Sequence, residues 1–217
     1  MGIKTSALAI ISRIKAKEVL SLSYPDLVMT VDECEKVTGI RATKTNDSNK
    51  WHRKADPFPE TIEVFNKLGM TLTCVDIVAS RNVETVIDLN YTQDLGQFDL
   101  VLDCGTTEHC FNIGQALMNA ANAVKEGGYI LHTPPLNMIN HGFYCLQPTL
   151  FYDFYTQNGW DVEFIAGELN NEYFDIPAIQ RVTAPSETSL IVLAKRLNNR
   201  PLIYPMQSKY LANPELK

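Results

Sequence analysis

The sequence has 217 residues, of which 45% are hydrophobic and 20% charged, with a formal net charge of −6. This length allows one sizeable hydrophobic core and is short for two, so we predict a single domain over residues 1–217. The acidic balance, with an isoelectric point near 5.2, argues against a surface that binds duplex nucleic acid through its phosphates. No run of about 18 apolar residues occurs, which argues against a membrane span.

Five cysteines are scattered along the chain, without a Cys-x-x-Cys pair or a spacing typical of cysteine and histidine metal ligands. We interpret them as reduced, mostly buried thiols of a cytoplasmic protein. They are Cys34, Cys74, Cys104, Cys110 and Cys145.

The first third of the chain predicts two helices and one strand. Apolar residues at helical spacing predict an amphipathic N-terminal helix within residues 1–17, and a short apolar alternation predicts a strand over residues 18–23. The polar stretch 42–59 predicts a surface loop. A second helix over residues 59–68 follows, with Gly69 at the position of a helix C-cap.

Strands and helices then alternate. Short runs rich in Val, Ile and Leu predict strands, and a longer amphipathic stretch predicts a helix that Gly127-Gly128 end. Strands that alternate with helices predict a parallel sheet with helices on both faces. The strands are expected over residues 71–77, 85–89, 98–103 and 129–133, and the helix over residues 111–124.

The last third predicts an aromatic helix that ends near Gly159 and two strands over residues 160–166 and 189–197, which could pair as an antiparallel edge. Residues 200–217, with three prolines, predict an extended tail. We therefore predict an α/β fold with a doubly wound, mostly parallel sheet of about seven strands and an antiparallel edge strand.

Ligands of open α/β sheets bind outside the carboxyl ends of the strands, so polar residues at those ends are candidate site residues. Asp76 ends one predicted strand, where a carboxylate can accept hydrogen bonds from both hydroxyls of a ribose. An ordinary turn or helix-cap aspartate is the alternative. Asp88 ends the next strand, where it or the neighbouring backbone could face an adenine amino group.

The strand over residues 98–103 leads into Gly105, which lets the backbone approach a ligand closely, and then into Glu108 and His109. We predict that Glu108 and His109 are catalytic, because a carboxylate and an imidazole can orient a substrate or move a proton near neutral pH. The alternatives are a helix-start carboxylate for Glu108 and a packed histidine for His109.

Polar and aromatic residues lie at the end of the strand over residues 129–133 and after it, and four of them are candidate substrate-binding residues: His132, Asn137, His141 and Tyr144. A capped loop is the alternative for the polar residues, and a helix core face for the aromatic segment, which could also form a lid. The sequence contains no GxSxG, Walker or HExxH pattern and no GxGxxG after a predicted strand. Hydrolases, nucleoside triphosphatases and nicotinamide-dependent oxidoreductases are therefore disfavoured.

The order of these features resembles the class I S-adenosylmethionine-dependent methyltransferases. The resemblance is strongest between Phe65 and Asn137. It is carried by Phe65-Asn66-Lys67-Leu68-Gly69, Asp76, Asp88-Leu89-Asn90, Phe98-Asp99-Leu100-Val101-Leu102-Asp103, Glu108-His109 and Val124-Lys125-Glu126-Gly127-Gly128, the last being similar to the family's leucine-lysine-proline-glycine-glycine turn.

The resemblance implies a Rossmann-like fold and S-adenosylmethionine as the cofactor. It implies that the cofactor is bordered by residues after three strands: Asp76 and Ile77 at the ribose, Asp88 and Leu89 at the adenine, and Asp103, Cys104 and Gly105 at the methionine side. The family's glycine-rich first loop corresponds here to residues 20–26, where a serine, Ser23, replaces the expected glycine. Cofactor binding at that loop would depend on the small side chains of Ser21 and Ser23.

Two further implications concern metal and substrate. Metal-binding relatives have a glutamate three residues before the Glu-His pair, and because Gly105 occupies that position here, we predict no metal. The stretches 140–144 and 148–151 resemble a bacterial and viral subgroup that is often near surface-sugar genes. We therefore predict a methyltransferase acting on a small molecule or sugar, and the resemblance points to surface-polysaccharide metabolism as its setting. The alternative is a non-catalytic methyltransferase-like protein for binding or assembly, motivated by the missing glycines.

Overall fold

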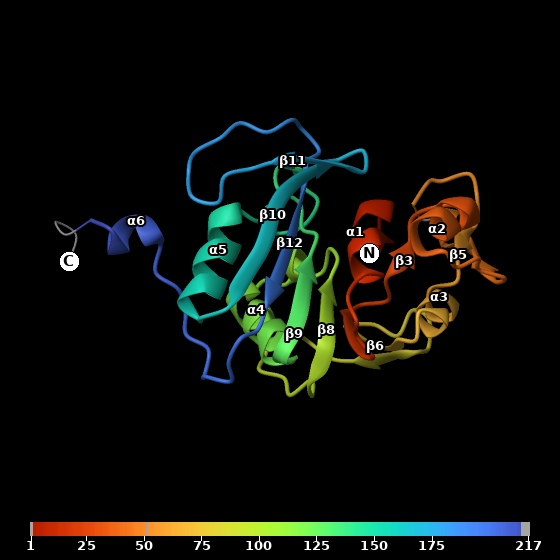
Figure 1. Ribbon diagram of the computed structural model, residues 1–217, viewed down its shortest axis with the longest axis horizontal. Helices are drawn as coiled ribbons and strands as arrows, with labels where there is room; N and C mark the ends of the chain where they lie inside the picture. Colours follow the sequence, from red (N-terminus) through yellow and green to blue (C-terminus); the bar gives the residue numbers. More distant parts are fainter. Residues whose placement is uncertain (1, 51, 214–217) are drawn as a thin grey trace.

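The computed structural model describes residues 2–50 and 52–213. Its main feature is an eight-stranded sheet with the order β11-β10-β12-β9-β8-β2-β6-β7 (Figure 1). The strands are β2 (Glu18–Leu22), β6 (Thr71–Asp76), β7 (Glu84–Val86), β8 (Phe98–Asp103), β9 (Val124–His132), β10 (Asp161–Leu169), β11 (Glu172–Asp175) and β12 (Ser189–Lys195).

Five neighbouring strands, β9, β8, β2, β6 and β7, run parallel, as predicted. The two late strands pair antiparallel, also as predicted, but β12 does not lie at the edge: it pairs antiparallel with both β9 and β10. The edge beyond β10 is formed by β11, a short strand that the sequence reasoning missed. The five parallel strands place their carboxyl ends along one edge of the sheet, which is where a ligand site is expected.

Helices cover both faces of the sheet, and residues of single strands alternate between the two cores. Val101 packs in the core beneath α4 (Ile113–Asn122) and α5 (Pro148–Gln157), whereas its neighbours Leu100 and Leu102 pack in the core beneath α1 (Thr5–Ile11) and α3 (Thr61–Lys67). All three side chains are fully buried. The sheet is therefore apolar on both faces, which explains the continuous Val, Ile and Leu runs of its strands.

The N-terminal part differs from the prediction in two places. Helix α1 ends at Ile11 because the chain then turns into β2, and the amides of Lys17 and Glu18 donate to the Asp99 carboxylate at 2.9 Å each instead of continuing a helix. A helix not predicted, α2 (Val31–Thr38), follows β2.

Short strands tie this N-terminal part to the site edge. Strand β1 (Gly2–Ile3) pairs in parallel with β3 (Asp26–Leu27), which follows the end of β2. The described residues of the predicted loop over 42–59 form β4 (Thr45–Asn46), the 3₁₀ turn η1 (Asp47–Lys50) and β5 (Phe58–Pro59), joined by irregular segments. The beginning of the chain thus lies beside the carboxyl end of β2.

The prediction that Gly127 and Gly128 separate a helix from a strand is wrong, because β9 begins at Val124 and runs through both glycines. The reason is local: a Cβ atom at Gly128 would lie 2.9 Å from the carbonyl oxygen of Asp99 on the neighbouring strand β8. Gly128 thus permits close approach of two strands rather than ending a helix.

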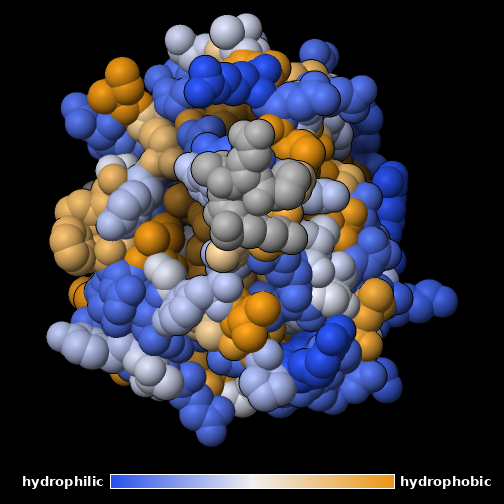
Figure 2. Space-filling model, turned by 90° about the vertical axis from the view of Figure 1, so that its left-hand side faces the viewer, coloured by the Kyte–Doolittle hydropathy of each residue, from blue (hydrophilic) through white to orange (hydrophobic). Residues whose placement is uncertain are grey.

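The C-terminal segment carries one short helix, α6 (Ser208–Leu211), on an otherwise extended chain, and residues 214–217 of the predicted tail lie outside the described residues. Figure 2 shows the face on this side of the molecule, where hydrophobic residues form separate groups among hydrophilic ones. Four cysteines are buried, Cys145 is exposed, and all five are free thiols. No described helix is long and apolar enough to cross a membrane.

Candidate active site

The loop after β2 adopts a glycine-type backbone without a glycine. Ser23 has a φ of 90°, in the left-handed region that glycine favours, and its amide donates to the carbonyl of Val75 at 2.6 Å. Gly105, after the neighbouring strand β8, has a φ of 95°. Two adjacent parallel strands therefore end in the same kind of turn. Ser21 is fully buried within β2, so only Ser23 of the two predicted serines lies at the surface of the loop.

The bulky residues that follow Ser23 are taken up by neighbouring segments. Tyr24 is buried, its hydroxyl donates to Glu60 at 2.5 Å, and the guanidinium of Arg81 lies 5.1 Å from the centre of its ring. Burial, together with Glu60, raises the pKa of Tyr24, so the phenol stays neutral. Arg81 also pairs with the buried Asp26 at 2.9 Å. These contacts fix the loop in one conformation.

Asp76 ends β6, as predicted, whereas the strand predicted over residues 85–89 ends already at Val86, so that Asp88 lies in the loop after β7. The Asp76 carboxylate is half-buried and accepts one long hydrogen bond, from the amide of Val78 at 3.3 Å. Beside it the side chain of Ile77 is 62% exposed. One oxygen of Asp88 accepts from the amide and side chain of Asn90 at 2.9 and 2.8 Å, which closes its own turn. Asp76 therefore has more capacity for a ligand than Asp88.

Leu89 and Cys104, two further residues expected at the cofactor, are both buried. Burial is also the main cause that raises the pKa of Cys104, to about 12, so its thiol is protonated near neutral pH. Cys104 still borders a cavity described below. It can contribute an apolar wall there but not a nucleophile.

Asp103 and His132 form a closed network inside the protein. Both are fully buried, and Nδ1 of His132 donates to the Asp103 carboxylate at 2.7 Å. The hydroxyl of Tyr155 lies 2.6 Å from Nε2 of the same imidazole, and Thr107 donates to Asp103 through its amide and hydroxyl. Burial opposes ionisation of Asp103, but the hydrogen bonds from His132 and Thr107 outweigh it and lower the pKa of that carboxyl.

This network changes how two predicted roles are understood. Both nitrogens of His132 have protein partners, so a direct contact with substrate would require one of those bonds to break. The Asp103 carboxylate likewise points to its partners rather than to a surface. The two residues hold the loop after β8 to β9, since Thr133 also donates its amide to the Asp103 carbonyl at 2.9 Å.

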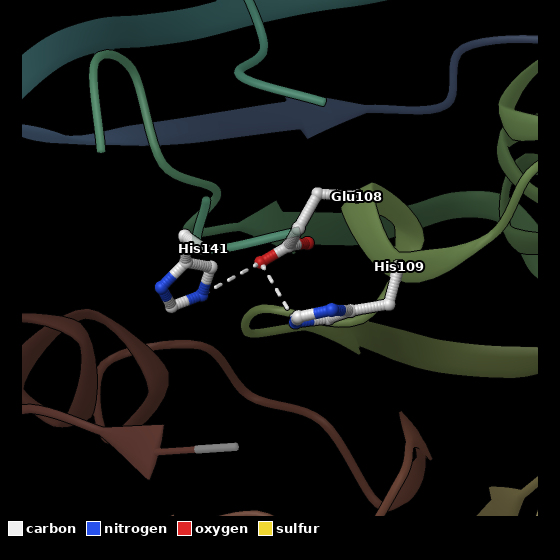
Figure 3. Close-up of side chains that lie close together, drawn as sticks. All are labelled: Glu108, His109 and His141. Carbon is white, nitrogen blue, oxygen red and sulfur yellow. Dashed lines mark ion pairs between the residues drawn. The ribbon is translucent and has the colours of Figure 1, made fainter. Parts of the chain in front are cut away.

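Glu108 lies in the 3₁₀ turn η2 (Thr107–His109), in the loop that follows Asp103, but unlike that of Asp103 its carboxylate lacks hydrogen-bond partners in the described part of the chain. Its side chain is fully buried, and neither carboxylate oxygen has a hydrogen-bond partner among the described residues. Two imidazoles point toward it: Nε2 of His141 is 3.5 Å and Nε2 of His109 is 3.9 Å from Oε1 (Figure 3). The side chains of His109 and His141 are 50% and 44% exposed. Glu108 is the main cause that raises the pKa of His141.

The loop that carries His141 is docked on the backbone of Glu108. The amides of Phe143 and Tyr144 donate to the Glu108 carbonyl at 2.9 and 3.2 Å. A Cβ atom at Gly142 would lie 2.9 Å from that same oxygen, so only glycine permits this approach. The sequence thus places His141 against Glu108 through a specific backbone contact.

Glu108, His109 and His141 border a cavity of about 560 Å³. Its far wall includes Lys4 and the buried Glu168, which form an ion pair of 2.5 Å. The sequence reasoning missed this pair because its members come from the start of the chain and from β10, and no local motif links them. The cavity combines charged, polar and apolar walls, which suits a small polar molecule.

The four predicted substrate-binding residues do not gather in this cavity. Only His141 borders it. Asn137 donates to the carbonyl of Pro185 at 2.6 Å, accepts from the amide of Thr188 at 2.9 Å, and borders a separate cavity of about 590 Å³. The hydroxyl of Tyr144 donates to the carbonyl of Phe111 at 2.9 Å. Asn137 and Tyr144 are therefore engaged in holding loops together.

Comparison with known proteins gives matches of structure alone. No protein-family model and no curated protein sequence matches the chain. The structure is similar to that of TehB from Haemophilus influenzae, with a TM-score of 0.53 and 11% identity, over 87% of this chain. The chain spans 61% of the length of TehB.

A second similar structure is the O-methyltransferase from the trans-AT PKS multienzyme of Brevibacillus brevis, in complex with S-adenosyl-L-homocysteine. The TM-score is 0.51 and the identity 9%, and the match covers 88% of this chain and 71% of that one. Both matches cover most of this chain, whose eight-stranded sheet has the order β11-β10-β12-β9-β8-β2-β6-β7, as a single fold with TM-scores above 0.5. The chain therefore has the Rossmann-like fold of the class I S-adenosylmethionine-dependent methyltransferases.

Proposed function

We propose that this protein is an S-adenosylmethionine-dependent methyltransferase that acts on a small molecule or sugar. The observation that carries the proposal is the backbone of Ser23, which adopts the left-handed conformation that a glycine would adopt after β2. The absence of glycines was the reason to consider a non-catalytic protein. With the turn preserved by a serine, that reason loses its weight.

The residues at the carboxyl edge fit this cofactor. The half-buried carboxylate of Asp76 can accept hydrogen bonds from ribose hydroxyls, and the exposed Ile77 offers an apolar surface beside it. The turns at Ser23 and Gly105 let the backbone lie close to a bound molecule. S-adenosylmethionine, when bound, supplies an electrophilic methyl group on its sulfonium.

The cavity beside Gly105 is the proposed acceptor site. Methyl transfer is an in-line displacement, so the main task of the protein is to hold the acceptor atom at near-attack distance. An oxygen or nitrogen acceptor suits the polar wall formed by Glu108, His109 and His141. His109 is half-exposed there and can take a proton from a hydroxyl acceptor.

Two finer parts of the proposal each rest on one separate observation. A sugar acceptor and a role in surface-polysaccharide metabolism rest on the resemblance of residues 140–151 alone. A cytoplasmic location rests on the five free thiols, four of them buried. The methyltransferase proposal does not depend on either.

The experiment is a calorimetric titration of the protein with S-adenosylmethionine, in parallel with Asp76→Ala and with Asp161→Asn as a control at an exposed carboxylate on β10. We expect saturable binding by the wild type and the control. Asp76→Ala should weaken binding by about 1–3 kcal/mol, the usual cost of a lost hydrogen bond to a charged group, or roughly 5- to 150-fold.

Two results would count against these assignments. Absence of wild-type binding at millimolar cofactor overturns the methyltransferase proposal. Unchanged affinity in a folded Asp76→Ala protein, checked by circular dichroism, refutes the placement of the ribose at Asp76.

A further inference from the structure

The carboxylate of Glu108 is buried, but its oxygens lack hydrogen-bond partners among the described residues. A carboxylate removed from water costs several kcal/mol unless it is paired and hydrogen-bonded. Among the described residues neither oxygen accepts a hydrogen bond, although the nearby buried carboxylate of Asp103 accepts two from Thr107, at 3.1 and 2.7 Å. The two neighbouring imidazoles, at 3.5 and 3.9 Å, are too far for hydrogen bonds, which lie near 2.7–3.2 Å.

Those distances instead match donors that share one metal ion. Bonds of about 2.0–2.2 Å to a tetrahedral ion place two donor atoms roughly 3.4 Å apart. The ligand atoms of Glu108, His109 and His141 all lie within 4.8 Å of one another. Figure 3 shows both rings turned toward the same carboxylate oxygen. Small side-chain rotations would therefore bring all three to one ion.

The backbone arrangement builds this geometry rather than leaving it to flexible side chains. Glu108 and His109 are adjacent in η2, and His141 is held there because the amides of Phe143 and Tyr144 bond to the Glu108 carbonyl. Gly142 permits the close approach, since a larger residue would meet the Glu108 backbone at 2.9 Å. Two segments distant in sequence thus converge on one point.

We propose that Glu108, His109 and His141 bind a divalent transition-metal ion, with zinc as the best-matched ion. Two imidazoles and one carboxylate form a donor set that suits zinc and its neighbours, whereas magnesium and calcium prefer sites made of oxygen atoms alone. Three protein donors leave at least one coordination position open for water or a ligand oxygen. That position faces the cavity of about 560 Å³.

The sequence predicts no metal, because Gly105 occupies the position three residues before the Glu-His pair, where metal-binding relatives have a glutamate. The third donor comes from His141, in the loop after β9. The ion site does not rest on the proposed methyltransferase function. If that function holds, a bound ion would take over from His109 the task of favouring the deprotonated form of a hydroxyl acceptor, because a ring nitrogen that binds the ion cannot also take a proton.

The test measures zinc binding directly, without cofactor or substrate. Tag-free protein carrying Cys145→Ser removes the one exposed cysteine, a competing zinc ligand. Calorimetry with zinc chloride should give saturable binding of one ion per chain, and magnesium chloride should bind far more weakly. Glu108→Gln and His141→Gln in the same background should each lower zinc affinity by about tenfold or more, as expected for loss of one of three donors.

Matched controls separate loss of a donor from general disturbance. Asp161→Asn removes an exposed carboxylate outside the three donors and the cavity, and it should bind zinc like the background protein. Gly142→Ala keeps all three donors but displaces the His141 loop, and it should also lower zinc affinity. The visible spectrum of bound cobalt, which reports donors directly, should change in Glu108→Gln and His141→Gln only.

The proposal is overturned if the Cys145→Ser protein binds no zinc at millimolar concentration, or if folded Glu108→Gln binds zinc and cobalt as the background protein does. Cofactor titrations are run with a chelator, and zinc titrations without cofactor. Failure of one binding reaction with the other intact therefore overturns only the proposal that depends on it.

Discussion

Two carboxylate–imidazole groups lie at the carboxyl end of β8, one in the strands and one in the loops that follow them, and they differ in how well their polar atoms are satisfied. Asp103 and His132 are fully buried, and their side chains bond to each other, to Thr107 and to Tyr155. Glu108 is equally buried, but its oxygens lack hydrogen-bond partners among the described residues, and its imidazole neighbours are half-exposed toward a cavity. The residue types are the same. The Asp103 group, whose polar atoms are hydrogen-bonded within the protein, is structural, whereas the Glu108 group, whose carboxylate lacks such bonds to the described residues, is the candidate ligand site.

The free energy of folding should respond to the two groups with opposite signs. A satisfied buried pair is costly to break, because the remaining partner is left charged and unpaired. A buried carboxylate without hydrogen-bond partners already lowers the free energy of unfolding, and natural binding sites often give up stability in this way. Substitutions in the two groups therefore test whether the first stabilises the fold and the second lowers its stability.

The largest effect is expected from His132→Ala, which leaves the Asp103 carboxylate buried without its main partner. We expect a loss of about 3–5 kcal/mol in the free energy of unfolding, measured by urea denaturation. His109→Ala, at a half-exposed histidine of the same loop, should change stability by about 0.5 kcal/mol or less. A loss below about 1 kcal/mol for His132→Ala would contradict the structural role of the network.

A smaller effect of opposite sign is expected from Glu108→Gln in metal-free protein. Removing a buried charge that lacks a hydrogen-bond partner should raise the free energy of unfolding by about 1 kcal/mol, as judged by the same denaturation experiment with a chelator present. Asp161→Asn, at an exposed carboxylate, is the control and should leave stability unchanged. A marked destabilisation by Glu108→Gln would show that the carboxylate has a structural partner after all.

The sheet could be predicted from the sequence where a strand's own residues determine it. Strand β8 was predicted with its exact bounds, because its apolar run is ended by Asp103 and a turn. Helix α2 was missed although its signal was present: Thr30 and Glu33 form a reciprocal capping box, and Gly39 ends the helix with a φ of 72°. The start of β9 was missed for a different reason: Gly128 is required by its close contact with the backbone of Asp99 on β8, which no local pattern shows.

The site was predictable only in part. The positions of Asp76, Gly105 and Glu108 follow from the ends of strands, which any α/β sheet brings to one edge. The different roles of His132 and His141 do not follow from the sequence, because both are histidines at or after the end of the same strand. They depend on Tyr155, whose hydroxyl bonds to Nε2 of His132, and on Gly142, which permits the His141 loop to approach Glu108. Contacts between distant segments of this kind leave no local pattern.

The central claim, that one group holds the fold and the other holds a ligand, is tested most directly by thermal unfolding with and without zinc. The proteins are the Cys145→Ser background and the same background with Glu108→Gln or His132→Ala. An ion at one hundred times its Kd that binds only the folded state adds about 2.7 kcal/mol, or roughly 5–10 °C in Tm for a chain of this size. We predict this rise in the background protein and in the less stable His132→Ala, and none in Glu108→Gln. Equal rises in all three, or no rise in the background protein, would contradict the claim.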